Sequence, residues 1–208
     1  MYTPKHFELK DPRLAQQLIA EHPFALLIGP DAQGRSFVTH VPLVRVADGE
    51  GAQDWWLEGH MAKANPHWGW LAAQRELLVV FNGPNAYISP SHYESTQAVP
   101  TWNYLAVHVH GLLEIVEAHE EKDALLKRLI AQHEPGYAAQ WRGLPEDFQG
   151  KMLGAIVGFR IRVQRVEAKA KLSQNRSAVE RARIAAHQAQ GTPEECSLAD
   201  WMGRLGLV

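Results

Sequence analysis

The feature that most constrains the fold of this chain is a series of extended apolar segments that helices interrupt without regular alternation. Six segments have the length and composition of β-strands, and they cover residues 24–28, 36–46, 55–60, 77–81, 102–116 and 156–166. A doubly wound parallel sheet needs a helix after each strand, and several of these segments follow one another without one. The pattern predicts a mainly β, α+β fold in which about six antiparallel strands form a small barrel with peripheral helices.

The longest predicted strand, 102–116, has two different faces. His108 and His110 share one parity, and Val107 and Val109 share the other. Capping signals and apolar residues at helical spacing indicate helices near 12–22, 64–75, 120–133, 145–152 and 178–188. Residues 47–53 predict a turn-rich link, and the Gly–Pro and Ser–Pro pairs within 83–100 predict a long loop of the kind that often carries function.

Composition places the chain among ordinary globular proteins, because 46% of its 208 residues are hydrophobic and 21% are charged. We expect one domain at 1–190 and a tail at 191–208, in which Thr192 begins a short helix that docks on a neighbour. The N-terminal residues lack the apolar run of a signal peptide, and no stretch reaches the ~20 apolar residues of a membrane helix. A cytoplasmic location is predicted, and the single Cys196 fits a reducing compartment.

The formal net charge of −2 is not the strongly basic signature of an autonomous DNA-binding domain. Basic residues nevertheless gather between Arg160 and Arg183, where eight Lys or Arg stand with two Glu. That window therefore carries +6 and the rest of the chain −8. A solvated strand and helix face would account for the window, and so would an anion site.

The segment from Gly59 to Trp68 lies where a predicted strand passes into a predicted helix. Such a junction offers backbone N–H groups to an anion, and His60 and Lys63 can add positive charge. Asn65 can donate a hydrogen bond to an anion. It can equally act as a plain N-cap in front of Pro66, with Lys63 solvated.

Two further segments carry groups that suit a flat heterocycle or an anion. Residues 99–104 combine Trp102, Asn103 and Tyr104, which can stack on and hydrogen-bond to a ring or can form an aromatic corner of the core. Residues 171–177 bring hydroxyl, amide and cationic groups to a helix start, where a plain N-cap is the alternative. No spacing suggests a third ligand beside the two histidines of 102–116, so no metal site is expected.

Together, in order along the chain, these segments are recognisable. The matching residues are 1–4 with 6–7 (MYTP, HF), 39–42 (THVP), 59–66 (GHMAKANP), 87–90 (YISP), 99–104 (VPTWNY) and 171–176 (KLSQNR). This ordered set resembles the PaiB-type negative transcriptional regulators, a family of FMN-binding proteins, from Met1 to about Arg183. No signature lies beyond Gln190.

The resemblance implies the split barrel of pyridoxamine-phosphate oxidases and flavin reductases, in which two chains pair and FMN lies at their interface. It implies flavin-phosphate contacts from the strand–helix junction, ring contacts from 39–42 and further contacts from a basic C-terminal element of the partner chain. The residues carried over as cofactor contacts are Thr39, His40, His60, Ala62, Lys63, Asn65, Trp102, Asn103, Lys171, Ser173, Gln174 and Arg176.

Three functions follow from the resemblance. The first is an FMN-binding homodimer that acts as a negative transcriptional regulator, directly on DNA or indirectly, although no helix-turn-helix is evident. The second is an FMN-dependent oxidoreductase acting on a small molecule, since flavin supplies the redox chemistry. The third is haem binding or degradation, for which the histidines of 102–116 could supply a ligand. No residue is identified as a catalytic acid or base.

Overall fold

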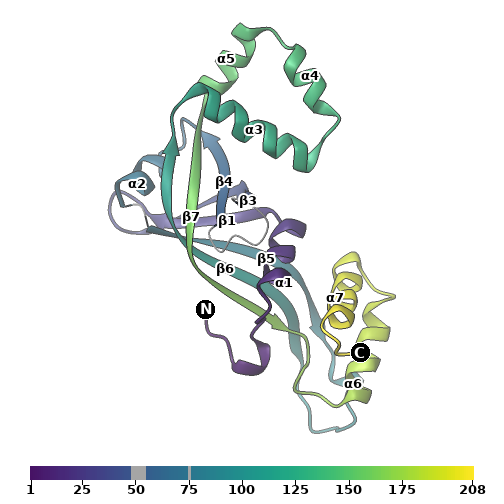
Figure 1. Cartoon of the computed structure of the whole chain (residues 1–208). Helices are drawn as coiled ribbons and strands as arrows, with labels where there is room; N and C mark the ends of the chain where they lie inside the picture. Colours follow the sequence, from purple (N-terminus) through teal and green to yellow (C-terminus); the bar gives the residue numbers. More distant parts are fainter. Residues whose placement is uncertain (48–54, 75) are drawn as a thin grey trace. The chain divides into compact units, whose positions relative to one another are not determined.

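In the computed structural model, seven strands form one sheet in the order β2-β1-β5-β6-β7-β4-β3 (Figure 1). The structure describes residues 1–47, 55–74 and 76–208. The strands are β1 (Phe24–Pro30), β2 (Ser36–Pro42), β3 (Val44–Ala47), β4 (Trp55–Ala62), β5 (Glu76–Ile88), β6 (Thr101–Val116) and β7 (Ile156–Lys171). Strand β1 pairs antiparallel with β2 and β5, and β4 pairs antiparallel with β3 and β7.

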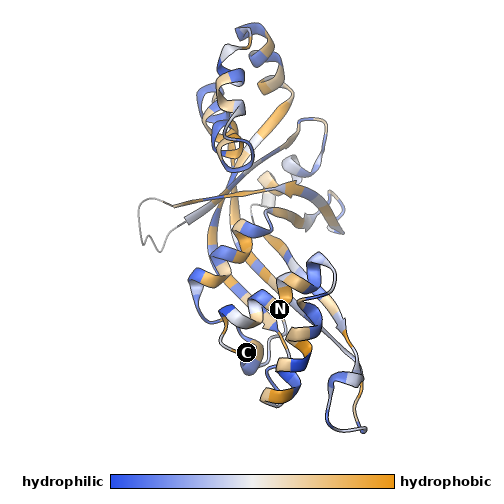
Figure 2. Cartoon of the chain, turned by 90° about the vertical axis from the view of Figure 1, so that its right-hand side faces the viewer, coloured by the Kyte–Doolittle hydropathy of each residue, from blue (hydrophilic) through white to orange (hydrophobic). Residues whose placement is uncertain are grey.

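Seven helices accompany the sheet in the described part of the chain. They are α1 (Pro12–Glu21), α2 (His67–Gln74), α3 (His119–His133), α4 (Tyr137–Gly143), α5 (Glu146–Gly154), α6 (Ala178–Gln188) and α7 (Pro193–Arg204), with short 3-10 turns η1 (Lys5–Phe7) and η2 (Pro90–His92). Most helices carry both polar and apolar residues in Figure 2, as expected where one face is covered and the other meets water. No described helix combines the length and apolar character that a membrane crossing requires.

The chain divides into two units, and strands β5, β6 and β7 contribute residues to both. The first unit contains Met1–Leu18, Asn82–Val107 and Glu167–Val208, and the second contains Ile19–Phe81 and His108–Val166. This division does not test the predicted domain boundary at residue 190, which stays a prediction.

In the second unit, strands β1 and β2 form a hairpin whose turn is fixed by Asp31. The Asp31 carboxylate accepts hydrogen bonds from the backbone N–H groups of Gln33 (2.8 Å) and Arg35 (2.9 Å). Gly34 adopts a φ of +76°, which a residue without Cβ takes at little cost. The bond from the Arg35 backbone, together with the Arg35 side chain, holds the pKa of Asp31 below its ordinary value.

The second unit also contains helices α3, α4 and α5 between β6 and β7. The buried Leu125 and Leu129 of α3 pack with Val44 and Val116, as the apolar stripe predicted from the sequence requires. Strand β4 lies against β7, and Gly59 of β4 has close neighbours. A Cβ added to Gly59 would lie 2.6 Å from Leu43 Cδ2, which explains a glycine at this point of the strand.

In the first unit, both C-terminal helices begin with a capping box. Ser177 caps α6 with Glu180, and Thr192 caps α7 with Glu195, so the helix start predicted at Thr192 is confirmed. The two helices pack against each other, and Trp201 of α7 is completely buried.

The structure corrects three sequence predictions about strands. The single run predicted at 36–46 is two strands, β2 and β3, because Pro42 has no N–H for a ladder and the Leu43 N–H donates to Pro23 O (2.9 Å). Strand β7 continues to Lys171 instead of ending at Val166.

Strand β5 continues to Ile88 through Gly83–Pro84, which the sequence analysis assigned to a loop. A Cβ on Gly83 would lie 2.8 Å from Leu18 Cδ1 and 3.0 Å from Leu105 Cβ, so this glycine marks a close approach and not a turn.

The observed helices agree with the helices predicted from the sequence better than the strands do. Helix α6 spans the predicted 178–188, whereas α4 was not predicted. Helix α2 begins at His67, later than the predicted 64. The predicted end of that helix at Arg75 and most of the predicted link at 47–53 lie outside the described residues.

Candidate functional site

Six of the predicted cofactor residues lie in the second unit, around the junction between β4 and α2. Asn65 holds this junction together. Its backbone N–H donates to Ala62 O (2.9 Å), and its Oδ1 accepts from the His67 backbone N–H (3.0 Å). Asn65 is therefore an N-cap, one of the two roles that the sequence left open.

The Asn65 amide also begins a short chain of hydrogen bonds. Its Nδ2 donates to Thr39 Oγ1 (3.1 Å), and Thr39 Oγ1 lies 2.8 Å from His67 Nδ1. The bond between Thr39 and His67 Nδ1 can run in either direction, because the hydroxyl oxygen that accepts from Asn65 has a second lone pair as well as its own hydrogen. This chain joins strand β2 to the start of α2.

His67 is a residue that the sequence analysis missed. It is completely buried, and burial lowers its pKa, so the ring is neutral. Its Nε2 is buried without a hydrogen-bond partner in the described part of the chain. Only its position two residues after a capping asparagine could have indicated it.

His60 and Lys63 differ in what they present. The half-buried His60 keeps an Nδ1 without a partner among the described residues, and burial lowers its pKa. The Lys63 side chain is exposed, but its backbone is engaged, because its N–H donates to Ala155 O (2.8 Å) and its carbonyl accepts from Trp68 Nε1 (3.0 Å). Lys63 can thus meet an anion with its ammonium group, not with its amide.

Ala62 and His40 complete the predicted group. Both are exposed, and the His40 ring stacks on Phe24 with ring centroids 6.0 Å apart and planes 27° apart. Phe24 is itself 64% exposed. This part of the second unit therefore presents flat aromatic surface on strands β1 and β2.

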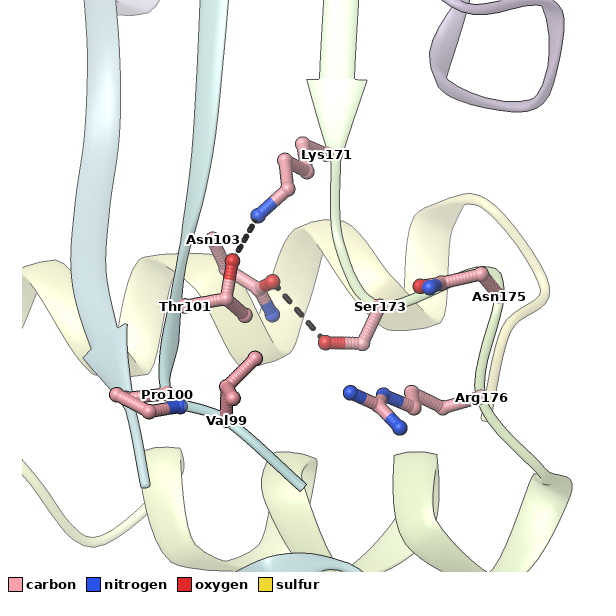
Figure 3. Close-up of a pocket in the computed structure, with 8 residues that line it drawn as sticks. All are labelled: Val99, Pro100, Thr101, Asn103, Lys171, Ser173, Asn175 and Arg176. Atoms are coloured by element: carbon pink, nitrogen blue, oxygen red, sulfur yellow. Dashed lines mark hydrogen bonds between the residues drawn. The ribbon is translucent and has the colours of Figure 1, made fainter. Parts of the chain in front are cut away.

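The other six predicted residues lie in the first unit, and four of them surround or line a small cavity. Figure 3 shows the cavity, which has a volume of about 140 Å³. Its lining residues are Val99, Pro100, Thr101, Asn103, Lys171, Ser173, Asn175 and Arg176.

Lys171 is held at one side of the cavity. Its Nζ donates to Thr101 Oγ1 and to the carbonyl oxygen of Trp102 (2.5 Å). Burial lowers the pKa of Lys171, and the nearby charges of Lys169 and Arg176 lower it further. The ammonium group therefore lies near two other cations.

Arg176 and Ser173 face the cavity from the turn after β7. The Arg176 guanidinium lies over the ring of Tyr93, 3.8 Å from the ring centroid. The sequence analysis did not select Tyr93. Ser173 has a φ of +62°, and its Oγ donates to Asn103 Oδ1 (3.0 Å). The other amide atom of Asn103, Nδ2, is buried without a partner among the described residues.

Gln174 and Trp102 lie outside the lining of the cavity. Gln174 binds its own turn, because its Oε1 accepts from the Leu172 N–H (2.7 Å) and its Nε2 donates to Ala170 O (2.5 Å). The Trp102 side chain is 53% exposed and meets the ring of Tyr87 edge-on. The first holds the shape of the turn, and the second offers exposed aromatic surface.

A buried carboxylate joins the two loops that form the cavity. Glu180, in the first turn of α6, accepts from the backbone N–H groups of Glu94 (2.9 Å) and Ser177 (3.2 Å). These bonds, the Glu94 one foremost, lower the pKa of Glu180. The segment before Val99 and the segment after Arg176 are thereby fixed to one side chain.

One histidine of β6 lies next to an arginine. His110 Nε2 lies 2.9 Å from Arg165 Nη2. Within the described ranges, no three His, Cys, Asp or Glu side chains are grouped so as to hold a metal ion. The prediction of a haem ligand on this strand stays a prediction.

A charged cluster in the second unit was also missed from the sequence. Glu58 of β4 is buried and binds Arg128 Nε (2.6 Å) and Arg160 Nε (2.8 Å). It lines a cavity of about 420 Å³ together with both arginines. One glutamate within an apolar strand gave no sign that its partners would come from α3 and β7.

Comparison with known proteins identifies the family. Residues 1–165 match the family described as "Putative FMN-binding domain". The chain is 37% identical over 182 residues to "Protease synthase and sporulation protein PAI 2" of Bacillus subtilis, covering 85% of this chain and 84% of that protein.

Solved structures share the fold. The flavocytochrome Anf3 of Azotobacter vinelandii superposes with a TM-score of 0.62 at 15% identity, covering 81% of this chain and 72% of that one. The FAD and heme binding protein of Mycobacterium smegmatis gives 0.61 at 17% identity, covering 79% and 73%.

These matches confirm the predicted antiparallel split barrel with peripheral helices, with seven strands where about six were expected. The family match supports FMN as the cofactor. The chain belongs to the PaiB-type family that carries the "Putative FMN-binding domain".

Proposed function

We propose that this chain binds FMN as one half of a homodimer and that Lys63, His60 and Thr39 contribute to the flavin site. The observation that carries the proposal is the β4–α2 junction, where two groups lie close in sequence to the capped start of a helix. They are an exposed ammonium group and an imidazole nitrogen that has no partner among the described residues. A helix start and a cation both favour the phosphate of a nucleotide.

The groups present fit FMN in their chemistry. None of the twelve predicted contact residues is acidic, so a phosphate meets no like charge from them. The exposed ring pair of His40 and Phe24 offers a flat apolar surface of the kind that an isoalloxazine ring covers. Bound FMN supplies hydride or electron transfer at its ring, and the protein residues supply binding and orientation.

Asn65 and Thr39 have a positioning role in this proposal. Asn65 caps α2 and fixes the Thr39 hydroxyl, so strand β2 and the start of α2 keep one arrangement. His67, neutral and buried, completes that chain of bonds. The contacts predicted for Trp102, Asn103, Lys171, Ser173, Gln174 and Arg176 stay predictions and are not used in this proposal.

The absorption spectrum of the purified protein tests the flavin site. We expect the bands of oxidised flavin, and we expect the Lys63→Ala variant to lose affinity for FMN by about tenfold or more, because a hydrogen bond to a charged group is removed. Lys10→Ala removes an exposed lysine of the first unit and serves as the matched control. A protein that ignores added FMN would refute the proposal.

Homodimer formation has its own test. A cofactor shared across a two-fold interface needs both chains, so sedimentation should report a mass of two chains. A monomer with undiminished FMN affinity would contradict the shared site.

We propose that any regulatory effect, which the name of the Bacillus subtilis relative suggests, is indirect. Six of the eight cationic side chains in the basic window already have contacts within the protein. They are Arg160, Arg165, Lys169, Lys171, Arg176 and Arg181. Direct DNA binding relies on cations that reach the phosphates of a duplex, and Lys171 and Arg176 face a small cavity instead.

An FMN-dependent oxidoreductase is the second candidate function, because bound flavin supplies redox chemistry. Bleaching of the flavin bands by NADPH or NADH, with reoxidation by a small-molecule acceptor, would support it. Salt-sensitive, sequence-specific binding to duplex DNA without turnover would support direct regulation instead.

A further inference from the structure

The cavity of the first unit has the lining of an anion site. Lys171 and Arg176 bring two cations, and Asn103, Ser173 and Asn175 bring polar groups, while no acidic side chain is among its described lining residues. Figure 3 shows the guanidinium of Arg176 extending toward the Ser173 hydroxyl and the Asn103 amide. The polar groups therefore face a common space.

Asn103 gives a second, independent sign of a ligand. Its side chain is completely buried, and its Nδ2 has no hydrogen-bond partner among the described residues. Its Oδ1 is already occupied by the Ser173 hydroxyl (3.0 Å). A buried N–H donor without an acceptor is costly, and an oxygen atom placed in the cavity would satisfy it.

The charges of the cavity point to an anion for a separate reason. Lys171 is partly buried beside two other cations, and this environment lowers its pKa. Arg176 is held in place over Tyr93, so its N–H groups are oriented before a ligand arrives. An anion would offset the repulsion between the cations and accept from both.

The size of the cavity restricts what it can hold. Its volume is about 140 Å³, whereas pockets for whole drug-sized ligands have roughly 300–1,000 Å³. A phosphate or carboxylate group fits this space, and the three-ring system of a flavin does not.

We propose that this cavity binds the oxyanion group, phosphate or carboxylate, of a small molecule other than the flavin. The inference rests on the proposed function in one respect, because the single phosphate of FMN is assigned there to the β4–α2 junction. Asn103 Nδ2 and the Arg176 guanidinium donate to the oxyanion, and Lys171 contributes its charge.

Calorimetric titration of the full chain with inorganic phosphate and with acetate, in low-chloride buffer, tests the site. We expect one bound anion per chain, and we expect Arg176→Gln to weaken binding by about tenfold or more. Arg183→Gln makes the same change of charge on the exposed face of α6 and should leave affinity unchanged. Lys171→Met removes the second cation, so the test stands if Arg176→Gln fails to fold.

The two titrations, with phosphate and with acetate, distinguish which anionic group the cavity binds. Binding of phosphate alone indicates a phosphate ester, binding of acetate alone a carboxylate, and binding of both a general oxyanion site; all three support the proposal. Binding of neither probe overturns it, as does binding that survives both cavity variants.

Competition with FMN separates this inference from the proposed function. Phosphate binding that persists at saturating FMN and in Lys63→Ala supports a second site. Loss of phosphate binding on addition of FMN would assign the cavity to the flavin and overturn the inference. A chain that ignores FMN yet binds phosphate through Arg176 would refute the flavin proposal alone.

Discussion

The Thr39 hydroxyl joins two other side chains, which makes its removal a sensitive test of the β4–α2 junction. In Thr39→Val the shape of the side chain is kept and the hydroxyl is lost. Asn65 Nδ2 then loses its acceptor at 3.1 Å, and His67 Nδ1 loses its partner at 2.8 Å.

The magnitude follows from the burial of the two partners. His67 is completely buried, so leaving its Nδ1 unpaired costs about 1–3 kcal/mol. Asn65 is half-buried and regains a hydrogen bond from water, so its share is at most about 1 kcal/mol. A total of about 1–4 kcal/mol lowers the melting temperature of a chain of this length by about 2–16 °C.

Thermal unfolding followed by circular dichroism measures the effect, with Thr39→Ser as the matched control. Serine keeps the hydroxyl and removes only a methyl group, so its variant should melt closer to the wild type. Equal melting temperatures for the valine and serine variants, within about 1 °C, would refute the assigned hydrogen bonds. FMN affinity should fall in the valine variant and be retained in the serine variant.

Three further predictions concern stability. Gly59→Ala places a Cβ 2.6 Å from Leu43 Cδ2, so it should destabilise the folded protein by about 1–3 kcal/mol, measured by urea unfolding. An unchanged unfolding midpoint would contradict the close packing at this glycine. Glu58→Gln leaves two arginines without their buried carboxylate, so the free energy of unfolding should fall by about 3 kcal/mol. The exposed control Glu117→Gln should leave the free energy of unfolding unchanged. Burial lowers the pKa of His67 from 6.5, so the folded state binds fewer protons than the unfolded state and stability falls as pH drops below about 6.5. Melting temperatures at pH 7.5 and 5.5 check this, and His67→Gln should reduce the difference.

Much of the fold could be predicted from local sequence because the signals are local. The capping boxes of Ser177 and Thr192 gave the starts of α6 and α7, and alternating apolar residues gave β6 and much of β7. The errors lie where a distant contact decides the local structure. Gly83–Pro84 reads as a turn until Leu18 and Leu105 are seen to occupy the space of a side chain.

For the candidate site too, local sequence indicated some residues, whereas contacts between distant residues could not be predicted. The ordered motifs indicated Asn65, Lys171 and Arg176, but they could not show that Asn65 donates to Thr39 or that Arg176 lies over an aromatic ring. His67 and Glu58 were missed because their partners come from other elements of the second unit. Residue types can be read from a sequence, whereas such partners depend on how strands and helices meet.

The position of Glu180 has a consequence for how this family can diversify. One carboxylate on α6 fixes both loops beside the cavity, yet it is not among the residues that line it. The width of the cavity and the identity of its lining are therefore set by different positions. Substitution at Val99 or Asn175 can change which small molecule is accepted while the two loops stay in place. A search for relatives with altered ligand preference should compare those lining positions among chains that retain the glutamate.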